Sequence, residues 1–409
     1  MSLPSVDEAR AMMLARVCLL GGERVGLASA MGRILREDVR ATRDQPPFDA
    51  SAMDGWAVRK ADVPGVLEIV AESAAGHGWS GTLGRDEAVR IATGAALPEG
   101  ADWIVIQEEV VREGNRVRVG EPGATGFIRA QGADFAGGET VLSVGTRLDP
   151  WRIALVASAG CATLQVSVRP RVAIVATGDE LAAPGAVPGQ WQIHDSVGPG
   201  LAAWFDARGC AVTLLDTLPD DRAAVSAALR GVDCDLLVTI GGASVGDHDV
   251  VKPALGDLGL ELIVEGVAVR PGKPTWFGDF GNGRRVLGLP GNPVSAMVCA
   301  ELFAAPIIAR MEGAAPTAAV RRARLAAALP ANGPREHFMR ATLRYDAYGG
   351  LLADAASDQD SALVSILATA HALIRRPANA AAASAGETVE ILILGRASSG
   401  SPAEVTERF

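Results

Sequence analysis

The sequence predicts a multidomain protein of the α/β plus β class, built around a doubly wound, mostly parallel α/β domain. Between residues 171 and 313, strand-like apolar runs alternate with helical patterns, and three of these strands open into glycine-rich loops. Before and after this region, short apolar runs are separated by glycine, proline and aspartate, which is typical of β structure. The chain has 409 residues, too many for one core, and 49% of them are hydrophobic, so several domains can each bury a core.

The overall charge excludes two classes of partner. The formal net charge is −10, whereas nucleic acids and anionic membranes recruit proteins through a broad basic surface. We therefore expect no nucleic-acid partner and no membrane partner. Any pocket for an anion must be local.

The cysteines and the N-terminal residues indicate the compartment. The five cysteines, at positions 18, 161, 210, 234 and 299, form no CxxC or Cys/His spacing, so reduced and mostly buried thiols are expected. The N-terminal segment has no basic region followed by an apolar one, and no run approaches the roughly 18 apolar residues of a membrane span. A soluble cytoplasmic protein is expected.

The N-terminal segment predicts one helix that carries no chemistry. Ser5 and Glu8 have the spacing of a capping box, and apolar residues follow at helical spacing as far as Leu20. Gly21 and Gly22 are expected to end this helix. A docking helix is the preferred interpretation.

Residues 40–137 predict a β domain. Turn residues separate its short apolar runs, and the turn at 113–115 between two alternating strands indicates a hairpin. Two polar loops stand out, at 45–58 and 90–102. Loops of this composition are most often ordinary surface turns, so composition alone leaves their role open.

Residues 138–168 predict a return path toward the N-terminal helix. They contain one helical pattern, which begins at Pro150 and ends near Gly160. The Arg169-Pro170 step then marks a boundary, because the residue before proline is pushed out of helical conformations and a strand follows directly.

The α/β region, residues 169–313, has its glycine-rich loops at the ends of strands 171–176, 235–240 and 285–289, and a helix with Asn292 as its N-cap follows the third loop. In an open α/β sheet such loops lie together at the carboxyl edge and present backbone N–H groups to anions. The three loops therefore predict one shared pocket.

Residues 314–409 predict a separate small β barrel or sheet. Its strand-like runs are at 321–330, 337–346, 371–377 and 388–394, and one helix is expected over 361–369. The alanine-rich run 378–385 is expected to be a loop.

Two familiar phosphate motifs are excluded. Residues 266–275 have part of a P-loop pattern, but Val267 stands where a Walker A motif needs glycine, and Pro274 stands where it needs serine or threonine. No G-x-G-x-x-G follows any strand, so the dinucleotide fingerprint is absent. What remains is an anion pocket built from backbone N–H groups and a few charges.

Several side chains in these loops have the chemistry of a phosphate and cation site. Ser244 offers a hydroxyl, and Asp247 and Asp249 have the carboxylate oxygens to hold Mg²⁺ between phosphates. The alternative for Asp249 is a helix N-cap. Arg270 and Lys273 supply positive charge suited to a tetrahedral oxyanion, and the alternative for them is a solvated basic turn.

Six motifs in order resemble the molybdopterin molybdenumtransferase (MoeA) family, which includes the homologous domain of gephyrin. They are PPFDASAMDGWAV, RIATGAALPEGAD, VATGDEL, GGASVGDHD, VRPGKPTWF and LPGNPVS. The resemblance covers nearly the whole chain and implies four parts. These are a linker domain from residues 1–39 and 138–168, an inserted β domain at 40–137, an α/β molybdopterin-binding domain at 169–313, and a C-terminal β-barrel domain at 314–409.

The resemblance also implies an enzyme of molybdenum cofactor biosynthesis. Such an enzyme takes adenylylated molybdopterin and molybdate, inserts the metal and releases AMP, with Mg²⁺ as cofactor. A homodimer whose active site is shared between subunits is implied, with molybdopterin adenylyltransferase as a pathway partner. Two alternatives remain open: adenylyl transfer to molybdopterin on the same fold, and a gephyrin-like scaffold without turnover.

Site residues follow from the same resemblance. The catalytic candidates are Asp54, Thr93, Glu180 and Asp249. The candidates for the pterin and phosphate pocket are Thr177, Gly178, Asp179, Gly241, Gly242, Ser244, Gly246, Pro290, Gly291 and Asn292, with Asp247 and Asp249 as Mg²⁺ ligands. The candidates for the molybdate site are Arg270, Lys273, Pro274, Ser295, Arg340 and Ser361.

Overall fold

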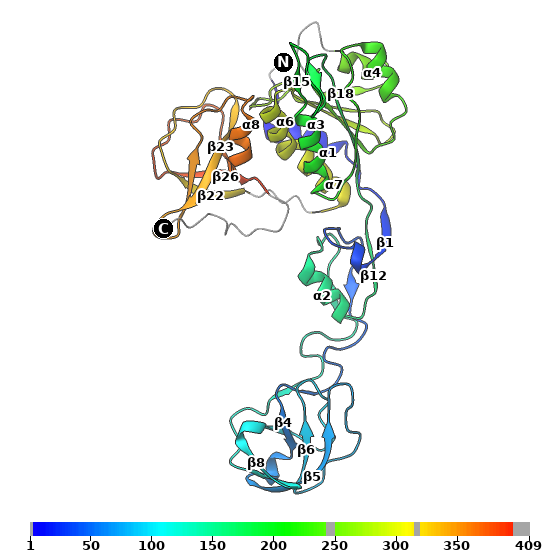
Figure 1. Ribbon diagram of the computed structural model, residues 1–409, viewed down its shortest axis with the longest axis vertical. Coiled ribbons are helices and arrows are strands. Elements are labelled where there is room, and N and C mark those ends of the chain that lie inside the picture. The colour runs from blue at the N-terminus through cyan, green and yellow to red at the C-terminus, as the bar shows by residue number, and fades with distance from the viewer. Residues whose placement is uncertain (1–2, 243–249, 315–319, 396–409) are drawn as a thin grey trace. The chain divides into compact units, whose positions relative to one another are not determined.

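The computed structural model describes residues 3–242, 250–314 and 320–395 (Figure 1). The chain divides into two compact units. Unit 1 contains Met1–Glu23, Gly32–Ile34 and Ser167–Phe409, and unit 2 contains Arg24–Met31 and Leu35–Val166. The finer division into four domains with the boundaries given above stays a prediction.

Unit 1 contains a six-stranded mixed sheet with the strand order β16-β13-β17-β21-β20-β18. The first four of these strands are parallel, whereas β20 is antiparallel to both β21 and β18. Their bounds are Ala211–Leu214 (β16), Arg171–Ala176 (β13), Leu236–Ile240 (β17), Arg285–Leu289 (β21), Trp276–Asp279 (β20) and Glu261–Val264 (β18). The prediction of a mostly parallel α/β sheet is confirmed.

Helices cover both faces of this sheet, because alternate residues of its strands are apolar on both sides. Val172 and Ile174 of β13 join a core cluster with α1, α3, α6 and α7, while Ala173 and Val175 join a second cluster with α4 and α5. The helices are α1 (Val6–Ala15), α3 (Val197–Asp206), α4 (Arg222–Leu229), α5 (Val251–Gly256), α6 (Pro293–Cys299) and α7 (Ala305–Glu312), with a π-helical turn at Ala300–Ala304 between the last two. The doubly wound arrangement is confirmed.

The first helix is shorter than the sequence predicts. Its capping box is present, but α1 ends at Ala15 rather than at Gly21. Residues 17–21 have no regular secondary structure, and the Leu20 backbone N–H donates to the Met311 carbonyl at 2.8 Å. Val17 is buried outside the helix. The apolar spacing of this stretch therefore reflects the packing of an irregular segment on the core.

One helical stretch in the described part of the chain is long and apolar enough to cross a membrane. It spans Pro293–Glu312, and 67% of its most apolar window is buried inside the protein. This stretch is α6 with α7, and both pack in the core cluster described above. The expectation that no run approaches the length of a membrane span was wrong for this stretch, and its burial identifies it as a core helix.

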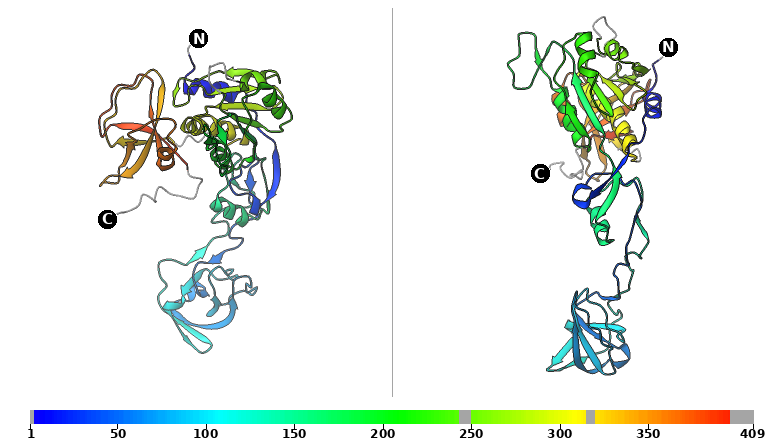
Figure 2. Two further views of the ribbon diagram at one scale, coloured as in Figure 1. Left: turned by 45° about the horizontal axis from the view of Figure 1, so that its top comes forward. Right: turned by 90° about the vertical axis from the view of Figure 1, so that its right-hand side faces the viewer.

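Five further strands of unit 1 form a closed barrel, drawn in yellow to red in Figure 2. The order is β23-β24-β22-β26-β25, and β25 pairs back onto β23. The strands are β22 (Val320–Leu325), β23 (Glu336–Tyr345), β24 (Leu351–Ala355), β25 (Ala372–Arg376) and β26 (Thr388–Ile393), with α8 at Val364–Thr369. The predicted barrel is confirmed. The sequence analysis missed β24, because this strand has only two large apolar residues.

Unit 2 contains a six-stranded sheet with the order β7-β4-β6-β5-β9-β8. The strands are β4 (Gly55–Val58), β5 (Gly65–Ser73), β6 (Glu87–Ile91), β7 (Trp103–Ile106), β8 (Val110–Glu113) and β9 (Arg116–Val119). The predicted hairpin is confirmed, since Glu113 pairs with Arg116 across a two-residue turn. The predicted helix at Pro150 is α2 (Pro150–Ser158), which Asp149 caps.

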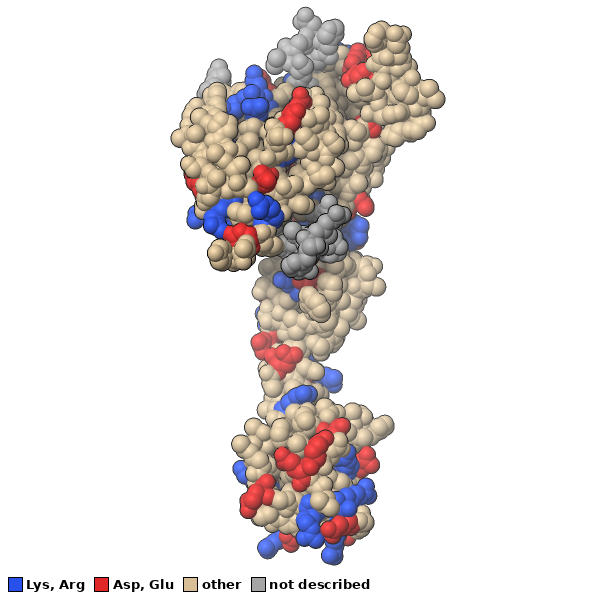
Figure 3. All heavy atoms as spheres, turned by 60° about the vertical axis from the view of Figure 1, so that its left-hand side comes forward, with Lys and Arg blue, Asp and Glu red and all other residues tan. Residues whose placement is uncertain are grey.

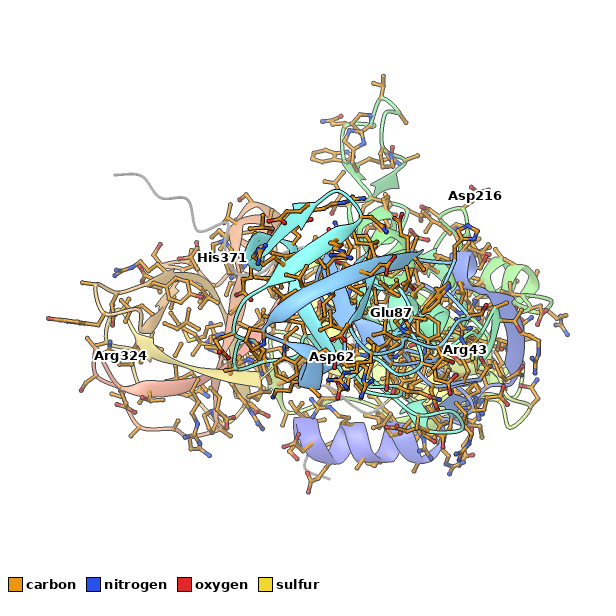
Figure 4. All side chains as sticks on the ribbon, turned by 90° about the horizontal axis from the view of Figure 1, so that it is seen from below. Arg43, Asp62, Glu87, Asp216, Arg324 and His371 are labelled. Atoms are coloured by element: carbon orange, nitrogen blue, oxygen red, sulfur yellow. The ribbon has the colours of Figure 1, made fainter. Side chains whose placement is uncertain are left out.

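The remaining elements are short. They are β1 (Gly22–Gly26), β2 (Val39–Arg40), β3 (Ala50–Ser51), β10 (Ile128–Arg129), β11 (Thr140–Leu142), β12 (Thr163–Ser167), β14 (Leu181–Ala182), β15 (Ile193–His194) and β19 (Val269–Arg270), with 3₁₀ turns at Leu27–Ser29, Lys60–Asp62 and Gln107–Glu109. Two carboxylates labelled in Figure 4, Asp62 and Glu87, accept backbone N–H groups of the loop before β6, from Asp86 at 3.1 Å and Gly84 at 2.7 Å. These two side chains have a structural role.

Candidate functional site

The predicted loops after β13, β17 and β21 meet at the carboxyl edge of the sheet. The Thr177 backbone N–H donates to the Ile240 carbonyl at 3.0 Å, and the Gly241 N–H donates to the Leu289 carbonyl at 3.2 Å. A Cβ built on Gly291 would lie 3.7 Å from the Gly241 Cα. The described parts of the three loops therefore lie side by side, as the strand order requires.

Two positions on this surface require glycine. Gly241 has a φ of +86°, and a Cβ there would lie 2.7 Å from the Thr177 carbonyl oxygen. Gly178 has a φ of +148°, a conformation that L side chains rarely adopt, and a Cβ there would also lie 2.5 Å from a carboxylate oxygen of Glu180. Side chains are thus excluded where a ligand has to approach the backbone closely.

Thr177 and Glu180 contribute polar groups to this surface. The Thr177 hydroxyl is buried and has no hydrogen-bond partner among the described residues, which is unusual for a buried hydroxyl. Asp179 and Glu180 are both exposed on the turn after β13, as the sequence predicts. Gly242 follows Gly241 with a positive φ of 55°.

The second loop is only partly described. Ser244, Gly246, Asp247 and Asp249 lie outside the described residues. Within residues 3–242, 250–314 and 320–395, no group of three or more His, Cys, Asp or Glu side chains is arranged to hold a metal ion. The assignment of Asp247 and Asp249 to Mg²⁺ stays a prediction.

The third loop joins the α/β sheet to the barrel. Asn292 occupies the N-cap position of α6, as predicted, but its side chain makes no capping bond. Its amide instead donates to the Ser361 hydroxyl at 2.7 Å, and the Val294 N–H donates to the Ser361 carbonyl at 3.1 Å. Pro290 before this loop is buried, and Ser295 in the first turn of α6 is 4% exposed. Three of the predicted site residues, Asn292, Ser295 and Ser361, are therefore brought together.

Arg270 and Lys273 lie on an exposed loop that is fixed to the end of α6. A Cβ on Gly272 would overlap the Cys299 sulfur, and the Thr275 hydroxyl donates to the Gly272 carbonyl at 2.8 Å. Both cationic side chains are exposed, and neither has a carboxylate partner among the described residues. Pro274 is half-buried beside them. Two unneutralised cations on a rigid loop suit the binding of an oxyanion.

The cysteines have no part in this site as reactive groups. All five are free, and Cys210, Cys234 and Cys299 are buried. Burial raises the pKa of Cys299 to about 12 and that of Cys234 to about 11. Both thiols are therefore protonated at neutral pH and act as packing groups.

Arg340 is a buried cation, whereas Arg270 and Lys273 are exposed. Its side chain is 1% exposed on β23. Its guanidinium donates to three backbone carbonyls of residues 358–363, those of Asp360 at 2.8 Å, Asp358 at 3.3 Å and Leu363 at 3.4 Å. Burial lowers the pKa of Arg340 below its usual value, although Asp358 and Asp360 oppose this effect. Arg340 holds the turn that carries Ser361.

His337 is a buried group near the site that the sequence analysis missed. It is 7% exposed on β23, and its register partner on β19 is Arg270. Burial, with the charges of Arg270, Arg340 and Arg335, lowers the pKa of His337 to about 4. Nothing in the sequence shows that β19 pairs with β23, so this cluster was not predictable. His337 is neutral at pH 7 among these three cations.

We expect His337 to make the protein less stable as the pH falls from about 6.5 to about 4. In this window the unfolded chain binds a proton at this position and the folded chain does not. The difference between the two pKa values corresponds to at most about 3 kcal/mol. Urea unfolding at pH 7, 5.5 and 4.5 should show a smaller loss of stability for His337→Gln than for the parent. His77→Gln, at an exposed position of unit 2, is the control, and equal slopes in all three proteins would contradict the prediction.

Asp54 and Thr93 are brought together in unit 2. One carboxylate oxygen of Asp54 accepts the Thr93 backbone N–H at 2.7 Å and its hydroxyl at 2.8 Å. These two hydrogen bonds, with a smaller effect of Arg90, lower the pKa of Asp54. The contact arises because β4 and β6 pair with Gly55 opposite Ile91, so the residues just outside both strands meet. Asp54 is an exposed, ionised carboxylate.

Charges of both signs are mixed on the face drawn in Figure 3, where Lys and Arg side chains are interspersed with Asp and Glu. This face presents no broad basic surface. Positive charge at the site is local, on Arg270 and Lys273 and on the buried Arg340.

The fold and the site define a multidomain protein with an α/β domain that carries glycine loops at its carboxyl edge and with a C-terminal barrel. Three family models match the chain. Residues 4–160 match the MoeA N-terminal region (domain I and II), residues 173–310 match a probable molybdopterin binding domain, and residues 322–394 match the MoeA C-terminal region (domain IV).

Known relatives agree with these matches. The molybdopterin molybdenumtransferase of Nostoc sp. is 37% identical over 331 residues, which cover 76% of each chain. That of Staphylococcus aureus is 31% identical over 380 residues, 90% of each chain. The crystal structure of the molybdopterin biosynthesis MoeA protein from Pyrococcus horikoshii OT3 superposes with a TM-score of 0.82 at 28% identity, covering 96% of this chain and 100% of that one. The chain therefore belongs to the molybdopterin molybdenumtransferases of the MoeA family, which act in molybdenum cofactor biosynthesis.

Proposed function

We propose that this enzyme binds adenylylated molybdopterin and molybdate, inserts the metal at the dithiolene sulfurs of the pterin, and releases AMP. The observation that carries the proposal is the contact between two kinds of surface. The third glycine loop leads into α6, and the end of α6 supports the loop of Arg270 and Lys273 through the Gly272–Cys299 packing. The surface proposed for phosphate and the loop proposed for the oxyanion therefore both contact α6.

The sheet loops would hold the adenylylated pterin. Backbone N–H groups at loops and helix N-termini favour phosphate, and the glycines at 178, 241 and 291 allow close approach. The residues we assign to this part are Thr177, Gly178, Asp179, Gly241, Gly242, Pro290, Gly291 and Asn292, with Ser244 and Gly246 beyond the described part. The Thr177 hydroxyl is the one buried polar group of this set that lacks a described partner.

The cationic loop would hold molybdate. Arg270 and Lys273 would supply charge, and Pro274, Ser295 and Ser361 would complete the set that we assign to molybdate. A tetrahedral oxyanion is recognised by several charge-assisted hydrogen bonds at once. Arg340 is included in this part because it holds the turn that carries Ser361.

Mg²⁺ fits the donor set at the phosphate surface. The adjacent carboxylates Asp179 and Glu180 are exposed there, and Mg²⁺ is usually bound by one or two carboxylates together with substrate phosphates. When bound, the ion would neutralise charge on the pyrophosphate. Asp247 and Asp249 remain the Mg²⁺ ligands that we propose from the sequence. The catalytic residues that we propose are Asp54, Thr93, Glu180 and Asp249.

We also propose a cytoplasmic homodimer in which unit 2 of one subunit completes the site of the other. Asp54 and Thr93 lie in unit 2, whereas all the other proposed site residues lie in unit 1. A molybdopterin adenylyltransferase would supply the substrate, because the adenylylated pterin has to be made before AMP is released.

The test is a reconstitution with purified components. The protein is incubated with adenylylated molybdopterin, Mg²⁺ and increasing molybdate, and AMP and metallated cofactor are measured. Molybdate-dependent release of AMP is expected. Consumption of ATP without molybdate would instead support adenylyl transfer, and a lack of turnover with retained partner binding would support a scaffold.

A further inference from the structure

The turn that carries Ser361 is held by a side chain that no motif indicated. Gln359 is half-buried in this turn. Its carbonyl oxygen accepts the Arg340 backbone N–H at 2.9 Å and the Arg340 Nε–H at 3.3 Å. Its amide nitrogen donates to the carbonyls of Arg340 at 3.0 Å and Ala356 at 2.9 Å. One side chain thus makes four hydrogen bonds.

This pattern copies that of a neighbouring strand. In an antiparallel pair, one residue exchanges an N–H···O bond in each direction with the residue opposite. β24 ends at Ala355, and just beyond it the Ala356 backbone N–H still donates to the Arg340 carbonyl at 2.9 Å. The side-chain amide of Gln359 adds to this backbone bond, because its oxygen accepts the Arg340 N–H and its nitrogen is a second donor to the Arg340 carbonyl. Gln359 therefore fixes the turn to β23 at the point where the sheet stops.

The turn that carries Ser361 also contacts the start of α6, which belongs to the proposed molybdate region. Ser361, two residues after Gln359, accepts from the Asn292 amide and from the Val294 N–H at the start of α6. The Arg340 guanidinium binds the carbonyls on both sides of Ser361. A displacement of Gln359 would therefore move Ser361 relative to α6.

We infer that Gln359 is a positioning residue for molybdate binding, acting on the oxyanion through Arg340 and Ser361 rather than by touching it. This inference rests on the proposed function. The neutral amide of Gln359 keeps the Ser361 hydroxyl of the barrel next to the start of α6. Its loss should weaken molybdate binding while leaving the chemical step in place.

The test compares Gln359→Leu, Ser361→Ala and the double variant as full-length proteins. Gln359→Leu should raise the KM for molybdate about tenfold and leave kcat at saturating molybdate within about twofold. If Gln359 acts through Ser361, the double variant should have the KM of Ser361→Ala alone, since coupled residues are not additive. Gln359→Glu keeps the two hydrogen bonds that the side-chain oxygen accepts, so its KM for molybdate should fall between those of the parent and Gln359→Leu.

Two further measurements separate positioning from a general loss of structure. Hydrogen exchange of residues 356–363, without substrate, should be faster in Gln359→Leu than in the parent. Asp346→Ala is the matched control, because Asp346 accepts two backbone N–H groups of the turn between β23 and β24. It should lower the melting temperature without changing the KM for molybdate.

The outcomes also separate this inference from the proposed function. A parent enzyme without molybdate-dependent AMP release would overturn the function, and equilibrium dialysis with molybdate would then still measure the effect of Gln359 on binding. An active parent with an unchanged KM in Gln359→Leu, additive effects in the double variant, or unchanged exchange of residues 356–363 would overturn the role of Gln359.

Discussion

Lys273→Ala is expected to raise the molybdate concentration for half-maximal activity by about tenfold or more, while AMP binding stays close to that of the parent. The reason is that Lys273 is an exposed cation without a carboxylate partner among the described residues, on a loop held rigidly against α6. Its removal takes charge from the oxyanion surface and leaves the glycine loops untouched. The measurement is a molybdate titration at saturating adenylylated pterin, with AMP binding followed by calorimetry.

A matched substitution tests whether the effect is local. Arg85→Ala removes a cation from unit 2, where the side chain is 81% exposed. It should change neither the molybdate concentration for half-maximal activity nor AMP binding. Lys273→Arg keeps the charge with another hydrogen-bond geometry, so its molybdate concentration for half-maximal activity should fall between those of the parent and Lys273→Ala. An unchanged molybdate dependence in Lys273→Ala would remove this residue from the site.

Asp54→Ala is expected to lower kcat about tenfold or more without unfolding the chain. The carboxylate is exposed, and its two hydrogen bonds are both with Thr93, so the fold loses little when it is removed. Melting temperature and circular dichroism should stay near those of the parent, and a loss of structure that accounts for the lost activity would argue against a direct role.

Mixing Asp54→Ala with Lys273→Ala tests the shared site. In a two-fold dimer with crossed sites, one of the two sites in each mixed dimer contains neither substitution. At a molybdate concentration too low for Lys273→Ala to turn over, random exchange of subunits should then restore about a quarter of the parental activity. If each site lies within one subunit, no site is intact in any dimer. Absence of rescue, with exchange verified by two affinity tags, would contradict the crossed arrangement.

The three sheet loops were predictable because strand order alone determines where they meet. Apolar runs that end in glycine mark the carboxyl ends of parallel strands, and hydrogen bonds such as Thr177 to Ile240 follow from that order. The position of Asn292 at the start of α6 was predictable for the same reason. Its partner was not, since the sequence favours capping by asparagine, whereas the structure uses its amide to hold Ser361.

The rest of the site depends on contacts between distant segments. Arg340 and Ser361 were expected to act together on the oxyanion, but the burial of the guanidinium and its bonds to three carbonyls follow from barrel closure. Gln359 and His337 belong to no motif, so only their neighbours reveal them. After the first helix, the apolar spacing continues beyond Ala15 because the irregular segment that follows packs on the same core.

The way the chain enters and leaves unit 2 has a consequence for folding. The Ser167 N–H donates to the Ile34 carbonyl at 2.8 Å, and Leu35 bridges to Val166, so the two ends of the long insertion are neighbours. A disordered connection of this length would make the first and second parts of unit 1 slow to find each other, because loop closure costs entropy. Once unit 2 has folded, its own structure holds these ends together and shortens the effective connection. We expect unit 2 to fold first, and the docking of α1 on the α/β core to follow it.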